Sequence, residues 1–554
     1  MSSQHPPRYA AATYGEKFNS PQMEARVMKQ LIVVKVMILG LVIAGLGGPA
    51  ASVATAKSAD DIQTQSLDKT VQSFTAVEGS DLMTKLEAAK TKAGSRQLPY
   101  WSAYSFDVRS GVAVDPTIRE FHGSMNTLGD TTVLVGTTAD GLPVETRNLA
   151  IFILRDPTTN QITRMEVYNL ERKREYGGYP VYWLGRSNNE ESLNYLRALA
   201  AAAPLDVLSE RAVLAIALHD DQRVGEMLKG FISSSPNQRV RSTATYWLGQ
   251  VGGEKEFLAG MVRNEAEDKK LRRSAAYAIG QGHDRGSLAI LQNLYETVKD
   301  VEIHRSVIGS IGNVDDISSA YTFLLSVAKN DSDVDSRRTA VRELGHFQRE
   351  DAADELIKIY ATDPNVEVKR AALRSLSETK SSKVQARLIE VARTDGNPEL
   401  RKQAIRVLSE RGEPAVDDLF RLFDSEKVPE VRRSTLQAMS EIKSTKIEDK
   451  LFEVATSDEN LDLRRSAIRL LGERAGKRSF EFLSATAQST DANTEVQMQA
   501  VRAIGQRKSE ESVPLLIKIA KTHPNQLVRK QAIRSLGESG DPRAVDFFKE
   551  VLTR

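Results

Sequence analysis

The 554-residue chain contains no cysteine, and aromatic residues make up only 6% of it. The absence of cysteine excludes disulfide bonds, thiol nucleophiles, cysteine-ligated zinc and iron–sulfur clusters. It is compatible with an oxidising compartment, in which a stray thiol is a liability.

The sequence also lacks an excess of either charge. Its 76 basic and 74 acidic residues leave a net charge of +2, so we expect no nucleic-acid partner. The chain is too long for one ordinary hydrophobic core. It therefore requires several domains or an array of repeats.

The N-terminal region contains one short apolar run, from Val36 to Leu46, which follows basic residues and precedes small residues ending at Ala56. This layout is typical of a secretory signal peptide cleaved before Lys57. Eleven residues are few for a membrane span, which needs about 20. We therefore expect an exported protein, periplasmic or extracellular, with no stable membrane span after cleavage.

Two alternatives for this run stay open: an uncleaved anchor, which would tether the protein to a membrane, and a buried helix. The first 22 residues are polar and unlike a usual signal-peptide start, so translation starting at Met23 or Met28 is a further alternative. We assign residues 1–56 to the signal peptide with its extension, and residues 57–97 to a linker with a short helix near residues 81–92.

Residues 98–170 change to a period of two, with Tyr100 and Tyr104 on one face of the first strand and Trp101 and Ala103 on the other, which predicts β-strands. Strands are expected from Tyr100 and at residues 131–138, 148–155 and 161–170. The last two are joined by a turn-forming cluster at residues 156–160. We interpret this segment as a small β module whose fold the sequence does not assign.

Residues 171–554 show a different pattern, a ten-residue window that recurs every 31–33 residues. A fixed short period indicates a solenoid, because one helix pair cannot bury its apolar face alone. Weaker copies extend the pattern upstream to Leu208 and then to Tyr176, where the segment 182–185 repeats residues 246–249. The clear windows begin at Val240, Leu271, Ile303, Ser336, Val368, Leu400, Val431, Leu463, Val496 and Val528.

Each repeat is predicted to hold two helices, and the window lies in the second. Asp363 is expected to cap the second helix of its repeat, with Pro364 at the first helical position. A glycine column is expected to close the same helices in a left-handed conformation. That column consists of Gly249, Gly280, Gly312, Gly345, Gly472, Gly505 and Gly537.

The recurring columns, an Asp, then an aliphatic residue followed by Arg or Lys, then Ala and Leu-Gly, resemble the short HEAT-like repeats of phycobilisome lyases. The run from Met165 to Gly185 is similar to the junction in exported bacterial HEAT-repeat proteins. The resemblance implies a mainly α fold, a right-handed solenoid of about eleven two-helix repeats preceded by a small β-rich module. It implies no activity.

A cationic column, six residues after the residue that opens the window, is the candidate site for binding a partner. Such helices usually line the concave face of a solenoid, where a ladder of guanidinium groups suits an acidic protein segment or an anionic polymer. The alternative is ordinary pairing with a Glu four residues later, as in Arg374 and Glu378. The column consists of Arg342, Arg374, Arg406, Arg469, Arg502 and Arg534.

A second cationic column directly follows the aliphatic residue that opens the window. We expect it to pair with the Asp of a neighbouring repeat and to stabilise the stack. It includes Arg401, Arg432, Arg464 and Arg529, with Asp395, Asp458 and Asp491 available as partners.

No other motif predicts chemistry. None of the seven histidines has metal-ligand spacing or a nearby serine elbow, and His304 and His523 are interpreted as surface substitutions. An aromatic set is expected to form a core between the β module and the first repeats rather than a ligand patch. This set is Tyr176, Tyr179, Tyr182, Trp183, Tyr246 and Trp247.

The sequence therefore predicts an exported protein-binding scaffold that is not an enzyme and carries no cofactor or metal. Two other functions stay open. One is an accessory subunit of a lyase-like or chromophore-handling system, and the other is a binder of an anionic glycan or polymer.

Overall fold

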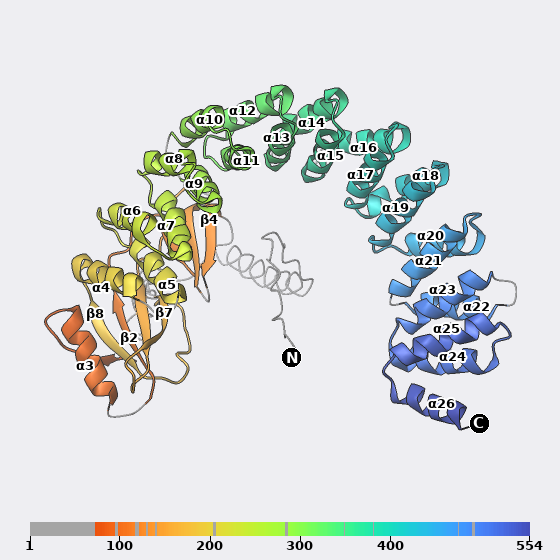
Figure 1. The fold of residues 1–554 in the computed structure, drawn as a ribbon, viewed down its shortest axis with the longest axis horizontal. Helices are drawn as coiled ribbons and strands as arrows, with labels where there is room; N and C mark the ends of the chain where they lie inside the picture. Colours follow the sequence, from red (N-terminus) through yellow and green to blue (C-terminus); the bar gives the residue numbers. More distant parts are fainter. Residues whose placement is uncertain are drawn as a thin grey trace, which may run out of the picture. The chain divides into compact units, whose positions relative to one another are not determined.

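The computed structural model describes eleven stretches of the chain, all within one compact unit, Ser66–Arg554 (Figure 1). The predicted signal peptide, residues 1–56, lies outside the described residues, as does much of the predicted linker. The described stretches are residues 73–94, 98–116, 121–128, 131–138, 141–202, 206–282, 286–347, 349–379, 382–474, 476–489 and 493–553.

The β module contains two sheets and one helix. A five-stranded sheet has the order β1-β8-β2-β6-β7, and a three-stranded sheet has the order β3-β5-β4. The elements are β1 Thr75–Ala76, α3 Leu82–Gly94, β2 Tyr100–Ser105, β3 Val112–Val114, β4 Phe121–Leu128, β5 Thr131–Thr138, β6 Leu149–Arg155, β7 Ile162–Asn169 and β8 Val181–Arg186.

The predicted alternation in β2 is confirmed. Tyr100 and Tyr104 are buried in the large core that continues into the helices, whereas Trp101 and Ala103 are buried in a separate cluster around Phe152. Successive side chains of a strand point to opposite faces, so both faces of this sheet are covered. The predicted strands at 131–138, 148–155 and 161–170 correspond to β5, β6 and β7 within one residue at each end.

The weakest copy of the repeat window, which begins at Tyr176, is not helical. Its second half, together with Arg186, forms β8, which pairs in parallel with β2 through Trp101 and Val181 and with β1 on its other side. A short apolar run fits a strand as well as a buried helix. The segment forms a strand because its backbone can pair with β1 on one side and β2 on the other. The similarity of residues 182–185 to residues 246–249 therefore does not indicate a helix.

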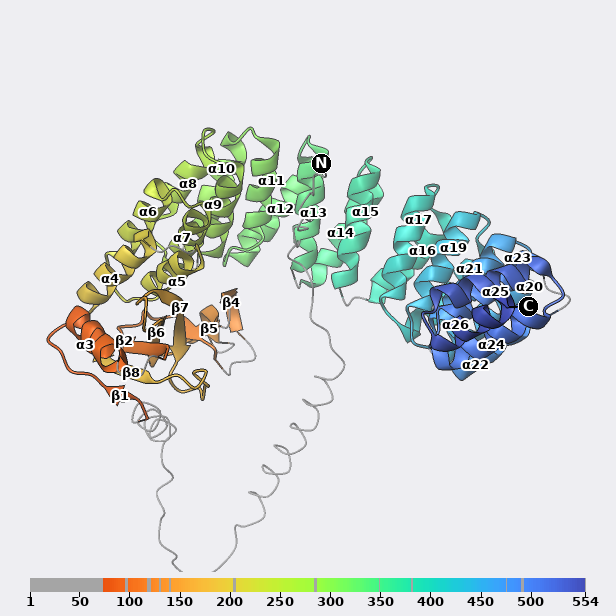
Figure 2. The same cartoon turned by 60° about the horizontal axis from the view of Figure 1, so that its bottom comes forward.

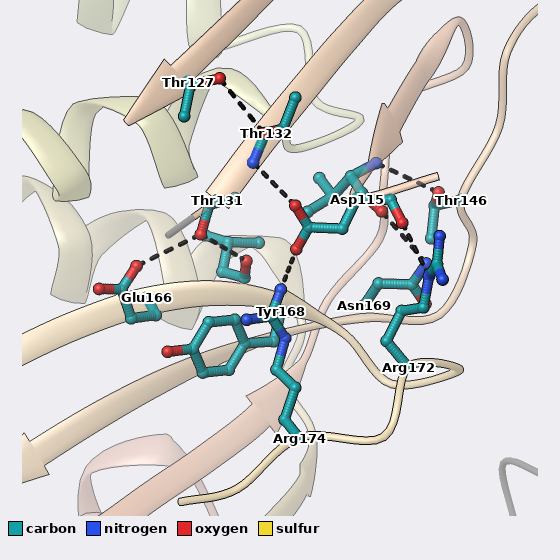
Figure 3. A network of polar contacts seen from close by, with 12 residues as sticks. Asp115, Thr127, Thr131, Thr132, Thr146, Glu166, Tyr168, Asn169, Arg172 and Arg174 are labelled. Carbon is teal, nitrogen blue, oxygen red and sulfur yellow. Dashed lines mark hydrogen bonds and ion pairs between the residues drawn. The ribbon is translucent and has the colours of Figure 1, made fainter. Parts of the chain in front are cut away.

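Two sheets are joined by a polar network around Asp115, which Figure 3 shows at its centre. The Asp115 carboxylate accepts a hydrogen bond from the Thr132 backbone N–H at 2.8 Å and forms an ion pair with Arg174. The Thr131 hydroxyl donates to Glu166 on β7 at 3.3 Å. These contacts attach the three-stranded sheet to the edge of the larger sheet.

The β module is also attached to the first repeats. Arg211 on α5 and Glu166 form an ion pair in which both side chains are less than 7% exposed. The Arg109 guanidinium donates to the Gln250 backbone oxygen at 2.9 Å, and Ser124 donates to the Gln250 side chain at 2.8 Å. The module therefore covers the N-terminal end of the repeats rather than being linked by a tether.

Eleven helix pairs followed by one further helix form the solenoid in the described residues, which agrees with the predicted fold. The first helices are α4 Asn189–Ala202, α6 Val224–Ser234, α8 Lys255–Arg263, α10 Ser287–Thr297, α12 Ile317–Asn330, α14 Glu350–Thr362, α16 Ser382–Thr394, α18 Val416–Ser425, α20 Thr445–Ser457, α22 Lys477–Gln488 and α24 Ser509–Thr522. The second helices are α5 Asp206–Ala217, α7 Gln238–Val251, α9 Lys269–Gln281, α11 Val301–Ile311, α13 Val334–His346, α15 Val366–Ser375, α17 Pro398–Ser409, α19 Pro429–Ser440, α21 Leu461–Glu473, α23 Thr494–Gly505 and α25 Gln526–Glu538. The last helix is α26 Pro542–Leu552.

Successive second helices lie side by side in chain order, as both views show (Figures 1 and 2). They pack against one another more closely than the first helices do. We call the solvent-facing side of this layer the second-helix surface.

The glycine column explains this close packing, and the predicted left-handed helix ends are wrong. None of the seven glycines has a positive φ. A Cβ at Gly345 would instead lie 2.7 Å from the Ser375 Cβ of the next second helix, and one at Gly472 would lie 2.7 Å from the Ala503 Cβ. Glycine is required there because a neighbouring helix occupies the space of a side chain.

The predicted cap of α15 is also wrong. Asn365 is the N-cap, since its side chain accepts from the Glu367 backbone N–H, and the helix begins at Val366. Asp363 lies two residues earlier, where it accepts from the Asn365 backbone N–H at 2.8 Å. Asn397 and Asn460 cap α17 and α21 in the same way.

Within the described residues, no helix combines the length and apolarity needed to cross a membrane. The same residues contain no group of three or more His, Asp and Glu side chains placed to hold a metal ion.

Candidate binding surface

All six arginines of the candidate column lie on second helices, with side chains on the second-helix surface. Arg342, Arg374, Arg406, Arg502 and Arg534 are exposed, and Arg469 is half-buried. On α19 the column is occupied by Gln437, which divides the arginines into two groups of three. The first group is on α13, α15 and α17, and the second is on α21, α23 and α25.

The second group is engaged by neighbours. Arg469 pairs with Glu473 at 2.5 Å and Arg534 with Glu538 at 3.0 Å, both four residues apart in a continuous helix. Arg502 donates to the side chains of Gln499 and Gln531 at 2.9 and 3.3 Å. For Arg469 and Arg534 the predicted pairing within the helix is confirmed.

The same pairing fails for Arg374 and Arg406. α15 ends at Ser375 and continues as a 3-10 turn to Glu378, and α17 ends at Ser409, so that Glu410 is its C-cap. An i,i+4 contact needs regular helix between the two residues. Neither arginine forms an ion pair or a side-chain hydrogen bond with any described residue.

A groove of about 440 Å³ lies between α13 and α15 on this surface. Its walls carry four arginines but only two glutamates, so the groove has an excess of positive charge. Arg342 pairs with Glu343 at 3.0 Å, Arg338 with Asp335 at 2.9 Å, and Arg370 with Glu367. The lining residues are Arg338, Arg342, His346, Glu367, Arg370, Ala371, Arg374, Ser375 and Glu378.

Arg338 and Arg370 were not among the predicted site residues. They lie four residues before Arg342 and Arg374 in the same helices, and residues four apart share a helix face. This spacing is readable in the sequence and signals that the two positions belong to one surface.

The second cationic column, which directly follows the aliphatic residue that opens each window, joins consecutive repeats, as predicted. Arg337 pairs with Asp363 at 2.7 Å and Arg432 with Asp458 at 2.7 Å, each across one repeat boundary. The hydrogen bond to Asp363 raises the pKa of Arg337 above its ordinary value. These largely buried pairs hold the stack together and are not available to a partner.

Two members of this column depart from the predicted pairing with Asp, and for a third, Arg464, the prediction is not tested. Arg401 pairs with Glu426 at 2.8 Å, because a glutamate occupies the acidic position of the next repeat. Arg529 donates to the backbone oxygen of His523 at 2.6 Å. Asp491, the expected partner of Arg464, lies outside the described residues.

Among the described histidines, His219, His304 and His523 are buried or half-buried, whereas His346 is exposed and lines the groove. His219 is 2% exposed, and its Nε2 lies 2.8 Å from the Ser192 hydroxyl. Burial lowers the pKa of His219 to about 4, so the imidazole is neutral at pH 7. This serine–histidine contact is shielded from solvent, as a catalytic pair accessible to substrate would not be.

His304 and His523 are not surface substitutions, because His304 is half-buried and His523 is buried. His304 Nε2 lies 2.9 Å from the Tyr295 backbone oxygen. The imidazole therefore takes the place of the arginine found there in other repeats, within the packing between helices.

The predicted junction core of aromatic residues is divided. Tyr182 packs edge-to-face on Tyr100, with ring centroids 5.8 Å apart, on the helix side of the sheet. Trp183 lies on the opposite face, where Tyr176 stacks on Phe152 at 5.3 Å. The reason is strand alternation, because neighbouring residues of β8 cannot share a face.

A further hollow of about 620 Å³ lies where β2, β8 and the loop after α5 meet. Its charges are largely paired with one another, Arg186 with Asp107 and Arg147 with Glu145. The sequence analysis did not predict it, because its walls come from segments that are distant in the chain.

Comparison with known proteins identifies the repeats. A family model of HEAT repeats matches residues 321–396, 385–472 and 481–554, which confirms the predicted HEAT repeats. These matches include the α13–α17 surface. No curated protein sequence is similar enough to count as a match.

Several solved structures are similar in fold at low identity. Yeast importin-beta (Kap95p) is 10% identical, with a TM-score of 0.36, over 65% of this chain and 56% of that chain. The CpcE–CpcF complex of phycocyanin lyase from Nostoc sp. is 20% identical, with a TM-score of 0.24, over 45% and 96%. Human deoxyhypusine hydroxylase is 15% identical, with a TM-score of 0.22, over 54% and 98%. The chain spans a little over half the length of the importin-beta structures.

Proposed function

We propose that this HEAT-repeat protein is an exported, non-enzymatic scaffold that holds a partner protein by acidic side chains on the second-helix surface of α13, α15 and α17. The observation that carries the proposal is the state of Arg374 and Arg406. Both are exposed, and neither is paired with a described residue. The other arginines of the column have partners within the chain.

Guanidinium groups suit this role because they bind carboxylates through two parallel hydrogen bonds. Each exposed contact contributes little, about 0.2–1 kcal/mol, so useful affinity requires several contacts at once. A stack of repeats supplies them, since equivalent positions recur on successive helices.

Affinity capture with the full chain tests the binding role. The first bait is the native chain, the second carries Arg374→Glu and Arg406→Glu, and the control carries Arg469→Glu and Arg534→Glu. We expect one partner protein to be retained from an extract that includes the cell envelope by the native and control baits, and lost by the second. Both variants change charge equally, so the difference reports the position of the site.

Equal capture by all three baits would place the partner elsewhere and reject this surface. Capture of an anionic glycan instead of a protein, or an absorption band beyond that of protein in the purified chain, would favour the alternatives of polymer binding and chromophore handling.

Export rests on the N-terminal sequence, the basic residues and apolar run before Ala56. N-terminal sequencing of the protein from its native source tests it. We expect the mature chain to begin at Lys57, in an extracytoplasmic fraction. A mature chain that still contains residues 36–46 in the cytoplasm would contradict export.

A further inference from the structure

We infer that the segment bound at α13–α17 is extended, in a polyproline II conformation, with an acidic side chain at every third residue. This inference rests on the proposed function and specifies the partner of the same surface. Two features support it: the spacing of the second helices and the distribution of accessible charge.

The spacing of the arginine column follows from helix packing. Arg342, Arg374 and Arg406 occupy equivalent positions on three consecutive second helices, and packed helices have axes about 8–10 Å apart. Gly345 lies so close to Ser375 that α13 and α15 are among the closely packed pairs. Matching acidic groups must therefore recur about every 8–10 Å.

Only some backbone conformations present side chains on one face at that interval. A polyproline II segment has three residues per turn and rises about 3.1 Å per residue, so every third residue faces the same way about 9 Å further on. Residues on one face of a β-strand recur at about 6.6 Å or about 13 Å. Neither interval matches the 8–10 Å spacing of the arginine column.

An α-helix with acidic residues seven apart presents them about 10.5 Å apart. This interval exceeds the 8–10 Å spacing of packed helices, and the close approach of Gly345 to Ser375 favours the short end of that range. The polyproline II interval of about 9 Å therefore fits the column better.

The accessible arginines on α13 and α15 fit a ligand with one acidic side chain for each helix. Arg338 and Arg370 pair with acidic residues three positions away in their own helices, so they contribute less to a partner. Arg374 lines the groove without a partner. Arg342 pairs with Glu343, but its side chain is 61% exposed, against 42% for Arg338 and 37% for Arg370. The most accessible groups are thus one arginine per helix rather than a continuous basic patch.

Labelled twelve-residue peptides test the inference by fluorescence anisotropy with the full chain in low-salt buffer. Three of these peptides have the same composition, three glutamates among prolines and alanines, and differ only in glutamate spacing of two, three or four residues. A fourth, alanine-rich peptide is lengthened to about 18 residues, so that it can form a helix and present three glutamates seven apart. We expect the spacing of three to bind at least about fivefold more tightly than any other, because only it engages all three arginines.

The variant Arg374→Gln should remove this preference, and Arg469→Gln should leave it intact. Equal affinity for all spacings, or tighter binding of the helical peptide, would overturn the extended register while leaving acidic binding at this surface in place. Failure of every peptide to bind would instead contradict the proposed function.

Discussion

Gly345 on α13 lies against Ser375 on α15, so that a Cβ added to the glycine would be 2.7 Å from the Ser375 Cβ. Gly537 occupies the same column in α25, but no atom lies within 4 Å of its Cβ position. The two glycines therefore differ in their surroundings. The second helix of a following repeat packs on Gly345, and within the described part of the chain no further second helix follows α25 to pack on Gly537.

This difference predicts opposite effects of one substitution. Gly345→Ala forces two helices apart and should destabilise the central repeats by about 1–3 kcal/mol. Gly537→Ala meets open space and should be neutral, or stabilising by up to about 1 kcal/mol, since alanine favours helix. Urea unfolding followed by circular dichroism measures both, and equal effects would show that the column does not act through packing.

The buried ion pair between Arg211 and Glu166 predicts a large effect on the junction. Glu166→Gln leaves the Arg211 guanidinium buried without a counter-charge, which should cost about 3–5 kcal/mol locally. Hydrogen exchange of β7 and α5 should therefore accelerate strongly. The control Glu538→Gln removes the exposed pair with Arg534 and should change stability by less than about 1 kcal/mol.

The lowered pKa of His219 predicts a pH dependence. Its pKa is about 4 in the folded chain because of burial, against an ordinary value of 6.5. Between these values the unfolded chain binds a proton that the folded chain does not, so the stability from neutral His219 is complete above pH 6.5. It falls as pH drops toward 4, by up to roughly 3 kcal/mol.

Hydrogen exchange of α4 and α5 at pH 7 and pH 5 measures this loss. His219→Gln, which cannot be protonated, should reduce the difference between the two pH values in these helices. An unchanged difference in the variant would assign the effect to another group.

Glu378 predicts a gain of binding. It lines the α13–α15 groove beside Arg374 but does not pair with it, so its charge opposes an acidic ligand. Glu378→Gln should tighten binding of the three-spaced peptide by about twofold to fivefold in low salt, and added salt should reduce the gain. Glu473→Gln on α21 is the matched control, and we expect it to leave affinity unchanged.

The sequence analysis predicted the repeats well because the solenoid is built from local patterns. Each window carries its own apolar spacing, so the sequence predicted two helices in every repeat. The sequence analysis failed at Tyr176–Gly185. This segment matches the helical repeat window but forms β8, because its backbone pairs with β1 and β2.

The candidate surface was predicted only in part. The six arginines are on one layer as expected, but the sequence did not separate Arg374 and Arg406 from Arg469 and Arg534, since all four have a glutamate four residues later. The helix ends separate them, because α15 and α17 end before the glutamate whereas α21 and α25 include it.

The sequence by itself therefore determined the period, the helix pairs and the column of arginines, because helical spacing and stacking act over a few neighbouring residues. The tertiary structure decided which arginines are unpaired, why the glycines are needed and how the β module covers the first repeats. Those properties arise from contacts between residues roughly 30 to 140 positions apart, and no local pattern specifies them.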